Sequence, residues 1–201
     1  SRMKKLFFVL VLLSFNIDAA EIERVTRGNL AIEGIPEIPD ELVKRMRRYQ
    51  FSRSASFAGW TPDGRLTIST RFGNTNQMHV VDKPMGARRQ ITFFDEPIYG
   101  GDWSPTGARK GVAFIRDSGG DENYQLEYLD PAVADPVRLT DGRGRADTGV
   151  WSPDGTKLAV SLSKDGHTQV YSVNADGSGL RRLSNSNGID TEPQWSADGQ
   201  H

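Results

Sequence analysis

The tryptophans are the feature that most constrains the fold of this chain, because each of the four opens a similar turn-forming pentapeptide. The copies read Trp60-Thr-Pro-Asp-Gly64, Trp103-Ser-Pro-Thr-Gly107, Trp151-Ser-Pro-Asp-Gly155 and Trp195-Ser-Ala-Asp-Gly199. A spacing of about 40 to 50 residues is the signature of an internal repeat and, in a chain of this length, predicts a β-propeller. Propellers support many unrelated activities, so the repeat predicts the architecture and leaves the function open.

Two further anchors recur in step with the tryptophans. Each unit has a glutamine that opens a mainly apolar segment, and a threonine or serine follows 15 residues later: Gln77 and Thr92, Gln125 and Thr140, Gln169 and Ser184. The next tryptophan always comes 11 residues after that hydroxyl residue. Two spacings that hold three times are not expected of unrelated strands, so the units share one design.

Each unit is expected to form four short strands. The first strand ends at the tryptophan, and in the turn that follows, proline fixes φ while glycine accepts a positive φ. The second strands are expected at 66–70, 111–115 and 157–161. The third strand begins at the glutamine, and the fourth ends at the threonine or serine. The expected fold is therefore all-β, with three complete four-stranded blades and the start of a fourth.

Length differences between the units fall in the polar loops after the second strands, at 71–76, 116–123 and 164–168. Loops tolerate insertion and often carry function, so these three, with the mouth of the central channel, are the expected binding surface.

The predicted organisation is a signal peptide at 1–20, a lead-in segment at 21–50 with a helix at 40–50, and a partial propeller at 51–201. The blades are expected at about 54–97, 98–145 and 146–189, with a stub at 190–201. Propellers typically close four to eight blades into a ring. Three blades leave two open edges, so we expect either a fragment of a longer protein or self-association through those edges.

The N-terminus carries the pattern of a secretory signal. Lys4 and Lys5 precede the apolar run 6–13, and Ala19 and Ala20 offer a small-residue cleavage site. The run is shorter than the roughly 20 apolar residues of a membrane span. A periplasmic or secreted protein without stable membrane insertion is expected, with a retained N-terminal anchor as the alternative. Ser1 and Arg2 precede Met3 and are possible non-native residues.

The lead-in segment contains an amphipathic stretch from Asp40 to Gln50. Asp40 is the expected N-cap, and the apolar positions Leu42, Val43, Met46 and Tyr49 share one helical face. The opposite face carries Lys44, Arg45, Arg47 and Arg48. The apolar face is expected to pack on the propeller edge; contact with a membrane or an acidic partner is the alternative.

Composition excludes several classes of function. Removal of residues 1–20 leaves 22 basic and 25 acidic residues, a net charge of −3, which argues against a nucleic-acid-binding surface. Cysteine is absent, so no disulfide or thiolate metal site is possible. The three histidines, His79, His167 and His201, are expected to be strand or surface residues rather than ligands.

No group of residues points to a metal, a cofactor or a catalytic pair. Asp117, Asp121 and Glu122 could gather a hard cation such as Ca²⁺, but their spacing does not match an EF-hand loop, and a solvated acidic hairpin is expected. Propeller glycosidases need paired carboxylates, and nothing pairs two acids here. In the pentapeptides, the acids are expected to be turn residues; they are Asp63, Asp154 and Asp198, with Thr106 in the equivalent place of the second copy.

Residues 22–150 resemble the N-terminal propeller of prolyl-oligopeptidase-family serine peptidases. The resemblance lies in the segments 35–42, 68–73, 86–97 and 116–123. Residues 151–201 are more similar to TolB, the periplasmic propeller of the Tol-Pal envelope system, in the segments 174–183 and 188–195. Both families imply the same blade but different functions. TolB also has an α/β domain before its propeller, which residues 21–50 are too few to supply.

The peptidase resemblance implies a serine on a G-x-S-x-G elbow, followed by an acid and a histidine. The chain has no such elbow. Ser118 has Arg116 two positions before it, Ser178 has Asp176, and both serines fit polar turns. We therefore expect a non-catalytic secreted module that binds protein or peptide partners. The alternative is a truncated substrate-gating propeller that lacks its hydrolase domain, for which the sequence has no room.

Overall fold

The computed structural model describes residues 23–201 except 51, 106–108 and 134. The predicted signal peptide at 1–20 and the turn residue Thr106 lie outside the described residues.

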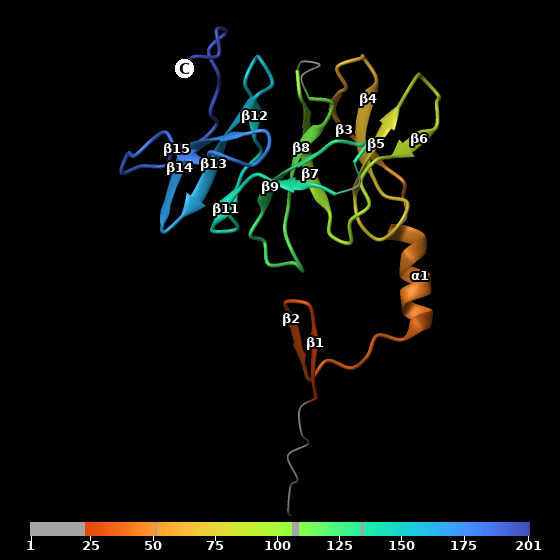
Figure 1. Cartoon of the computed structure of the whole chain (residues 1–201). Coiled ribbons are helices and arrows are strands. Elements are labelled where there is room, and N and C mark those ends of the chain that lie inside the picture. The colour runs from red at the N-terminus through yellow and green to blue at the C-terminus, as the bar shows by residue number, and fades with distance from the viewer. Residues whose placement is uncertain (1–22, 51, 106–108, 134) are drawn as a thin grey trace, which may run out of the picture.

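Three antiparallel sheets stand side by side, as the repeat predicts (Figure 1). The first has the order β3 (Ala55–Trp60), β4 (Leu66–Thr70), β5 (Gln77–Val81) and β6 (Arg88–Gln90). The second contains β7 (Ile98–Trp103), β8 (Val112–Arg116), β9 (Gln125–Leu129) and β10 (Val137–Arg138). The third contains β11 (Arg145–Ala146), β12 (Val150–Trp151), β13 (Lys157–Lys164), β14 (His167–Asn174) and β15 (Arg181–Arg182). The prediction of an all-β fold built from propeller blades is confirmed.

The third sheet differs from the prediction because its first strand is split. β11 and β12 both pair with β13, and residues 147–149 between them are not in a strand. The first strands of the other two sheets are irregular at a similar place, with register shifts between Phe57 and Gly59 and between Tyr99 and Asp102. Such irregularities bend a strand and re-aim its side chains.

Two other boundaries were predicted wrongly. The expected loop 164–168 is mostly strand, because β13 and β14 continue to Lys164 and His167 and leave Asp165 and Gly166 as a two-residue turn. Both turn residues have positive φ, at 52° and 79°, which is the type I′ geometry that Asp-Gly favours. The fourth strands are only two or three residues long and end before the threonine or serine.

The repeated glutamines and hydroxyl residues form equivalent hydrogen bonds to the backbone in all three units. The hydroxyl oxygens of Thr92, Thr140 and Ser184 accept hydrogen bonds from the backbone N–H groups of residues 78, 126 and 170, at 2.8, 3.1 and 3.0 Å. Each glutamine side chain amide donates to carbonyls in the connection to the next sheet, at positions 94 and 96, 144, and 186. The constant spacing therefore preserves a clamp that joins one blade to the next.

The repeated tryptophans join the sheets to one another. The indole Nε1 of Trp103 donates to Thr67 Oγ1, that of Trp151 to the Asp102 carbonyl and that of Trp195 to the Val150 carbonyl, each at 2.9 Å. Trp151 is 6% exposed and meets the Tyr128 ring edge-on at 5.8 Å. Trp60 is 62% exposed, because no propeller blade precedes the first one in the described part of the chain.

Apolar side chains fill the two spaces between the sheets. Between the first and second sheets lie Met78, Val80, Val112 and Phe114, with others; between the second and third lie Leu126, Tyr128, Leu158, Val160 and Leu162, with others. Residues on one face of a strand share its packing partner, and the alternation of Leu158, Val160 and Leu162 follows that period of two.

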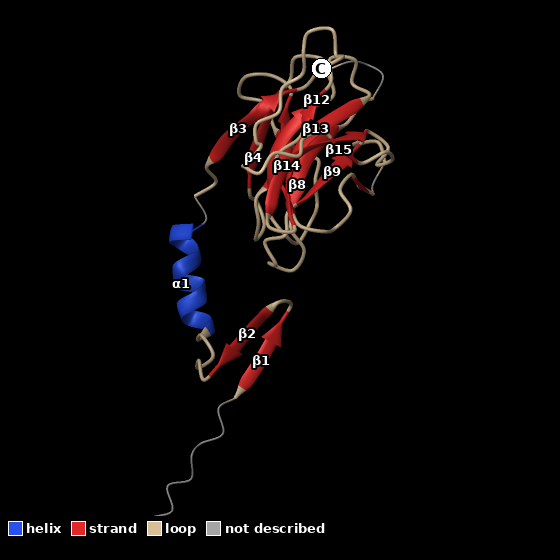
Figure 2. Cartoon of the chain, turned by 90° about the vertical axis from the view of Figure 1, so that its left-hand side faces the viewer, coloured by secondary structure: helices blue, strands red, loops and turns tan. Residues whose placement is uncertain are grey.

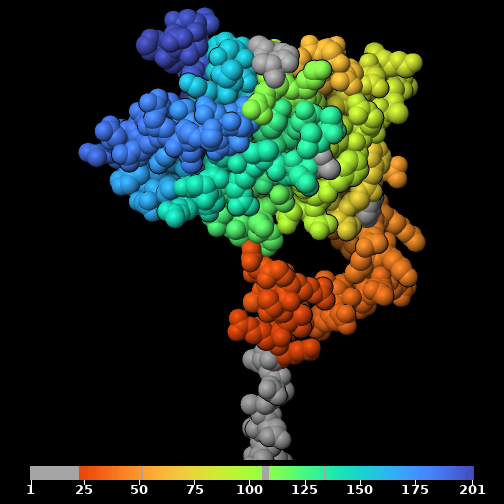
Figure 3. All heavy atoms as spheres, in the orientation of Figure 1, coloured from red at the N-terminus to blue at the C-terminus, as the bar shows by residue number. Residues whose placement is uncertain are grey.

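The described segment before the propeller, residues 23–50, forms an arm beneath it (Figures 1 and 2). It contains a hairpin that sequence analysis missed, β1 (Arg24–Arg27) and β2 (Leu30–Glu33), and the helix α1 (Asp40–Gln50). The hairpin tip reaches the second sheet, where Asn29 Nδ2 donates to the Ser118 carbonyl at 3.1 Å. Figure 3 shows the arm and the blades as one continuous surface on this side.

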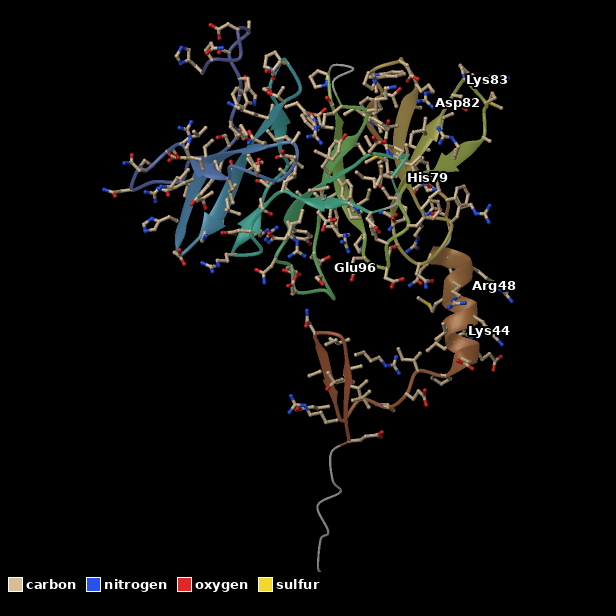
Figure 4. The ribbon with its side chains drawn as sticks, viewed as in Figure 1. Lys44, Arg48, His79, Asp82, Lys83 and Glu96 are labelled. Carbon is tan, nitrogen blue, oxygen red and sulfur yellow. The ribbon has the colours of Figure 1, made fainter. Side chains whose placement is uncertain are left out.

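The helix has the predicted range but not the predicted packing. None of its described residues is buried, and Leu42, Met46 and Tyr49 are 39%, 46% and 79% exposed. Lys44 and Arg48 project from the side of α1 that faces away from the hairpin (Figure 4). Its first hydrogen bond runs from Val43 N–H to the Pro39 carbonyl, so Asp40 lies within the helix rather than capping it. The expectation that α1 packs on the propeller edge is wrong.

Candidate functional site

A groove crosses the face of the propeller towards which the arm points. It combines a hollow of about 510 Å³ between the second and third sheets with one of about 470 Å³ beside the hairpin tip, and Tyr99 and Tyr124 line both. We call the two hollows together the lower-face groove. It lies where the loops after β8 and the connection from β10 to β11 meet.

Two tyrosines and an arginine form the centre of the groove. The rings of Tyr99 and Tyr124 meet edge-on at 5.4 Å, and the Arg145 guanidinium lies 4.9 Å from the centroid of the Tyr124 ring. Tyr99 is 45% exposed, so its ring is available to a ligand. Within the described residues, Arg145 has no ion-pair partner among the carboxylates. Stacking therefore orients the Arg145 guanidinium and leaves its five N–H donors free of any carboxylate.

The Gln125 clamp, which belongs to the second sheet, fixes the backbone just before Arg145. The Gln125 side chain amide donates to the Gly144 carbonyl at 2.8 Å, and its oxygen accepts from Thr140 Oγ1 at 2.7 Å and from Gly142 N–H at 3.0 Å. Gly144 has φ of 84°, and a Cβ there would overlap the Ser163 carbonyl oxygen. The turn before Arg145 is thus fixed by hydrogen bonds and by a glycine that no other residue can replace without strain.

Hydroxyl groups line the far wall of the groove. Ser161 is 3% exposed, and its Oγ has no hydrogen-bond partner. Ser163 Oγ and Thr168 Oγ1 lie 2.8 Å apart and share a hydrogen bond. The break between β11 and β12 lies opposite Ser161, whose carbonyl accepts from Asp147 N–H at 2.9 Å. A buried hydroxyl without a partner costs free energy, so a ligand group that reached Ser161 Oγ would relieve that cost.

The other end of the groove is acidic and rigid. Arg116 forms a two-pronged contact with Glu127, at 3.0 and 3.2 Å, and reaches Glu96 at 3.1 Å. Its guanidinium also lies 4.4 Å from the Phe94 ring centroid. Glu96, on this face in Figure 4, accepts from Gly119 N–H at 3.1 Å. That bond, together with Arg116, holds the pKa of Glu96 below its ordinary value.

Two of the acids considered as metal ligands accept hydrogen bonds from backbone N–H groups of their own loop. Asp121 Oδ1 accepts from Asn123 N–H at 2.9 Å and from Ser118 N–H at 3.4 Å, and Asp117 Oδ2 accepts from Glu122 N–H at 3.3 Å. Across the part of the chain that the structure describes, no three His, Cys, Asp or Glu side chains gather closely enough to hold a metal ion.

The acids of the pentapeptides are turn residues, as predicted. Their Oδ1 atoms accept from the hydroxyls of Thr61, Ser152 and Ser196, which lower the pKa values of the three carboxyls; the acids are Asp63, Asp154 and Asp198. For Asp63 the hydrogen bond from Arg65 is the larger cause.

The two serines weighed as nucleophiles lie in turns. Ser178 Oγ donates to Asp176 Oδ1 at 2.6 Å and accepts from Asn174 Nδ2 at 2.9 Å. Ser118 contacts the hairpin through its carbonyl, which accepts from Asn29. His167 lies at an exposed strand end and His201 is exposed, whereas His79 is buried in β5.

His79 gives the first sheet a pH-dependent stability. It is fully buried, its Nδ1 lies 3.0 Å from the Gln77 carbonyl, and its Nε2 has no partner. The Phe72 ring covers it edge-on at 5.1 Å, and Figure 4 shows it within the first sheet. Burial, with a smaller contribution from Arg88, holds its pKa below the ordinary 6.5.

Because the unfolded chain binds a proton near pH 6.5 that the folded chain resists, the free energy of unfolding should fall as the pH drops below that value. Well above pH 6.5, His79 is neutral in both the folded and the unfolded chain, so it does not lower the free energy of unfolding. The His79→Gln variant should lose this part of the slope in urea unfolding between pH 7.5 and 5, whereas the exposed control His167→Gln should keep it. Equal slopes in the wild type and His79→Gln would contradict the assignment.

The candidate groove lies beside the loops that the sequence predicts as a binding surface, but its central residues were not singled out in the sequence. The loops 71–76 and 116–123 lie on the face of the propeller that carries the groove. The third predicted loop, 164–168, is reduced to the two-residue turn at Asp165 and Gly166. Tyr99 and Tyr124 belong to the second sheet, whereas Arg145 and Ser161 belong to the third, so the pattern within one unit does not bring the four residues together. The one available signal was that Arg145 lies at the predicted boundary between the second and third blades.

Among the described residues, no helix is long and apolar enough to cross a membrane.

Comparison with known proteins supports the repeat. Residues 134–201 match a family model described as the TolB beta propeller domain. An uncharacterised protein of Agrobacterium fabrum is 32% identical over 131 residues, covering 64% of this chain and 43% of its own length. The Tol-Pal system protein TolB of Anaeromyxobacter dehalogenans is 34% identical over 93 residues, covering 46% of this chain and 20% of its own length. The chain thus spans less than half of either relative.

Solved structures show the same fold. A structure described as a TolB from Agrobacterium tumefaciens has a TM-score of 0.56 and 27% identity, over 68% of this chain and 48% of its own. TolB from Acinetobacter baumannii has a TM-score of 0.58 and 21% identity, over 74% and 36%. Dipeptidyl peptidase 4 from Porphyromonas gingivalis has a TM-score of 0.55 and 14% identity, over 66% and 19%. The last two likenesses concern the fold alone. Together the comparisons show a β-propeller fold, with TolB propeller repeats matched over residues 134–201.

Proposed function

From these TolB-like repeats and the geometry of the groove, we propose that the chain is a non-catalytic module that binds a protein or peptide partner across its lower-face groove. The observation that carries the proposal is the open centre of the groove, where a half-exposed tyrosine, a stacked arginine without an ion pair and a buried hydroxyl without a partner face one cavity. Peptide sites combine such aromatic surface with a few polar groups that fix orientation.

The relatives and the N-terminal sequence support a proposal for the location and the class of partner. The relative from Anaeromyxobacter is named a Tol-Pal system protein, a name that implies work alongside other proteins. The lysine pair and apolar run at the N-terminus fit export. We therefore place the chain in the periplasm or outside the cell, with a protein segment as ligand.

A peptide selection tests the proposal. Phage-displayed random peptides are selected on the purified chain, and the affinities of the selected peptides are measured by fluorescence polarisation. We expect Tyr99→Ala to weaken binding about tenfold, since stacking on an aromatic ring contributes on the order of 1 kcal/mol. The control Tyr49→Ala removes a tyrosine that is 79% exposed on α1 and should leave affinity unchanged. Failure to select any peptide, or equal losses in both variants, would overturn the proposal.

The second candidate function is a substrate-gating propeller of a serine peptidase, and it makes the same expectation about catalysis by this chain alone. The resemblance of segments such as 116–123 favours it. It requires a hydrolase domain to supply catalysis, so the purified chain itself should not react with a fluorophosphonate probe under either proposal. Labelling of a serine such as Ser118 would contradict the non-catalytic assignment.

A further inference from the structure

We infer that the lower-face groove recognises a carboxylate of its ligand, and that Arg145 is the group that receives it. The inference rests on the proposed function and adds the chemistry of the ligand: a peptide that presents either an acidic side chain or its C-terminal carboxylate. It follows from three observations about Arg145, Ser161 and their surroundings.

The first observation is the state of the Arg145 guanidinium. It is held against the Tyr124 ring, exposed, and without an ion pair in the described part of the chain. A guanidinium presents donors in a fixed fork that matches the two oxygens of a carboxylate. Stacking reduces the side-chain entropy that binding would otherwise cost, so Arg145 is a preorganised carboxylate receptor.

The second observation is that nearby acids are engaged elsewhere. Asp147, which also lines the hollow, accepts from the Thr148 N–H at 3.3 Å. Asp141, four residues before Arg145, is paired with Lys164 at 2.7 Å, and that lysine lowers its pKa in spite of partial burial. At the other end of the groove, Glu96 is bound to Arg116. Within the described residues, no carboxylate forms an ion pair with Arg145, so a ligand carboxylate would not have to displace one.

The third observation is independent of charge. Ser161 is nine-tenths or more buried, lines the same hollow as Arg145, and its Oγ has no partner. Arg145 pairs with Ser163 across the two strands, and Ala146 pairs with Leu162. Ser161 is therefore two residues along β13 from the residue that faces Arg145. A ligand held by Arg145 can place a backbone amide or carbonyl against Ser161, which would satisfy that hydroxyl.

Defined peptides test the inference, with binding followed by chemical-shift changes in the uniformly labelled full chain. One arm compares Ac-Gly-Phe-Glu-Gly-NH₂ with its Gln analogue, and the other compares Ac-Gly-Phe-Gly as the free acid with the amide. We expect at least one carboxylate peptide to bind about tenfold more tightly than its neutral analogue. The arm that shows the difference identifies the source of the carboxylate.

Variants connect the preference to the groove. Arg145→Gln should abolish the preference for the carboxylate, and Ser161→Ala should weaken binding of both members of a pair. The matched control Arg143→Gln, which changes an exposed arginine two residues away, should leave the preference unchanged. Thermal melting of each variant shows that the fold is retained.

The outcomes separate this inference from the proposed function. If selected peptides bind the groove but charged and neutral analogues bind equally, or if Arg145→Gln keeps the preference, the carboxylate assignment is overturned while peptide binding stands. If the selection yields no peptide at all, the proposed function itself has failed. A preference that Arg143→Gln removes would also overturn the assignment to Arg145.

Discussion

The Trp151→Ala variant should lose about 3–5 kcal/mol of unfolding free energy, the range for removal of a large buried aromatic side chain. Trp151 is 6% exposed, packs against Tyr128, and donates its indole N–H to the carbonyl of Asp102 in the neighbouring sheet. The substitution removes the packing and also leaves a part-buried carbonyl without its donor, which adds to the cost.

The repeat supplies a matched control for this prediction. Trp60 occupies the same place in its own pentapeptide but is 62% exposed and meets Phe57 at 5.9 Å. Trp60→Ala should therefore cost less than about 1 kcal/mol, the usual scale for exposed positions. Urea unfolding followed by circular dichroism measures both variants. Similar losses would show that the tryptophans do not join the sheets as described.

The Gln125→Ala variant should lose about 2–4 kcal/mol. Gln125 is 6% exposed and makes four hydrogen bonds: one to the Asn123 carbonyl, and three to residues 140, 142 and 144, which join β9 to the segment before β11. Alanine leaves the buried Thr140 hydroxyl and three part-buried groups without these partners, and each unpaired buried group costs roughly 1–3 kcal/mol, less where water can enter.

The same substitution should also affect the groove. Because Gln125 holds the Gly144 carbonyl and so the backbone before Arg145, Gln125→Ala should weaken peptide binding even at temperatures where the chain is fully folded. Gln90→Ala is the control: its side chain makes one hydrogen bond, to the Thr92 carbonyl at 2.7 Å, and is only half-buried. A larger loss of stability in Gln90→Ala than in Gln125→Ala would contradict the clamp.

Much of the fold was predictable because its determinants are local and repeated. The Ser/Thr-Pro-Asp-Gly turns fix chain reversals through short-range geometry, and the short apolar run of β8 is typical of a buried strand. The constant interval from each glutamine to the threonine or serine has its cause in a shared hydrogen bond, from the backbone N–H after the glutamine to the hydroxyl oxygen. Three occurrences of each signal made the prediction of blades secure.

The remaining features could not be predicted because they depend on contacts distant in sequence. The packing of α1 is one example: its amphipathic pattern predicts a helix and an apolar face but does not say what covers that face. The short hairpin β1–β2 has no periodic signal of useful length. The groove joins Tyr99, Tyr124, Arg145 and Ser161 from two sheets, and only the relative placement of the blades makes them neighbours.

Hydrogen–deuterium exchange with and without a selected peptide tests the central claim most directly, because it maps the contact surface without mutation. The account predicts that the peptide slows exchange in residues 95–99, 117–124 and 140–147, which surround the lower-face groove. Slower exchange confined to the opposite face, at the turns 61–65 and 152–156, or to α1, would contradict it.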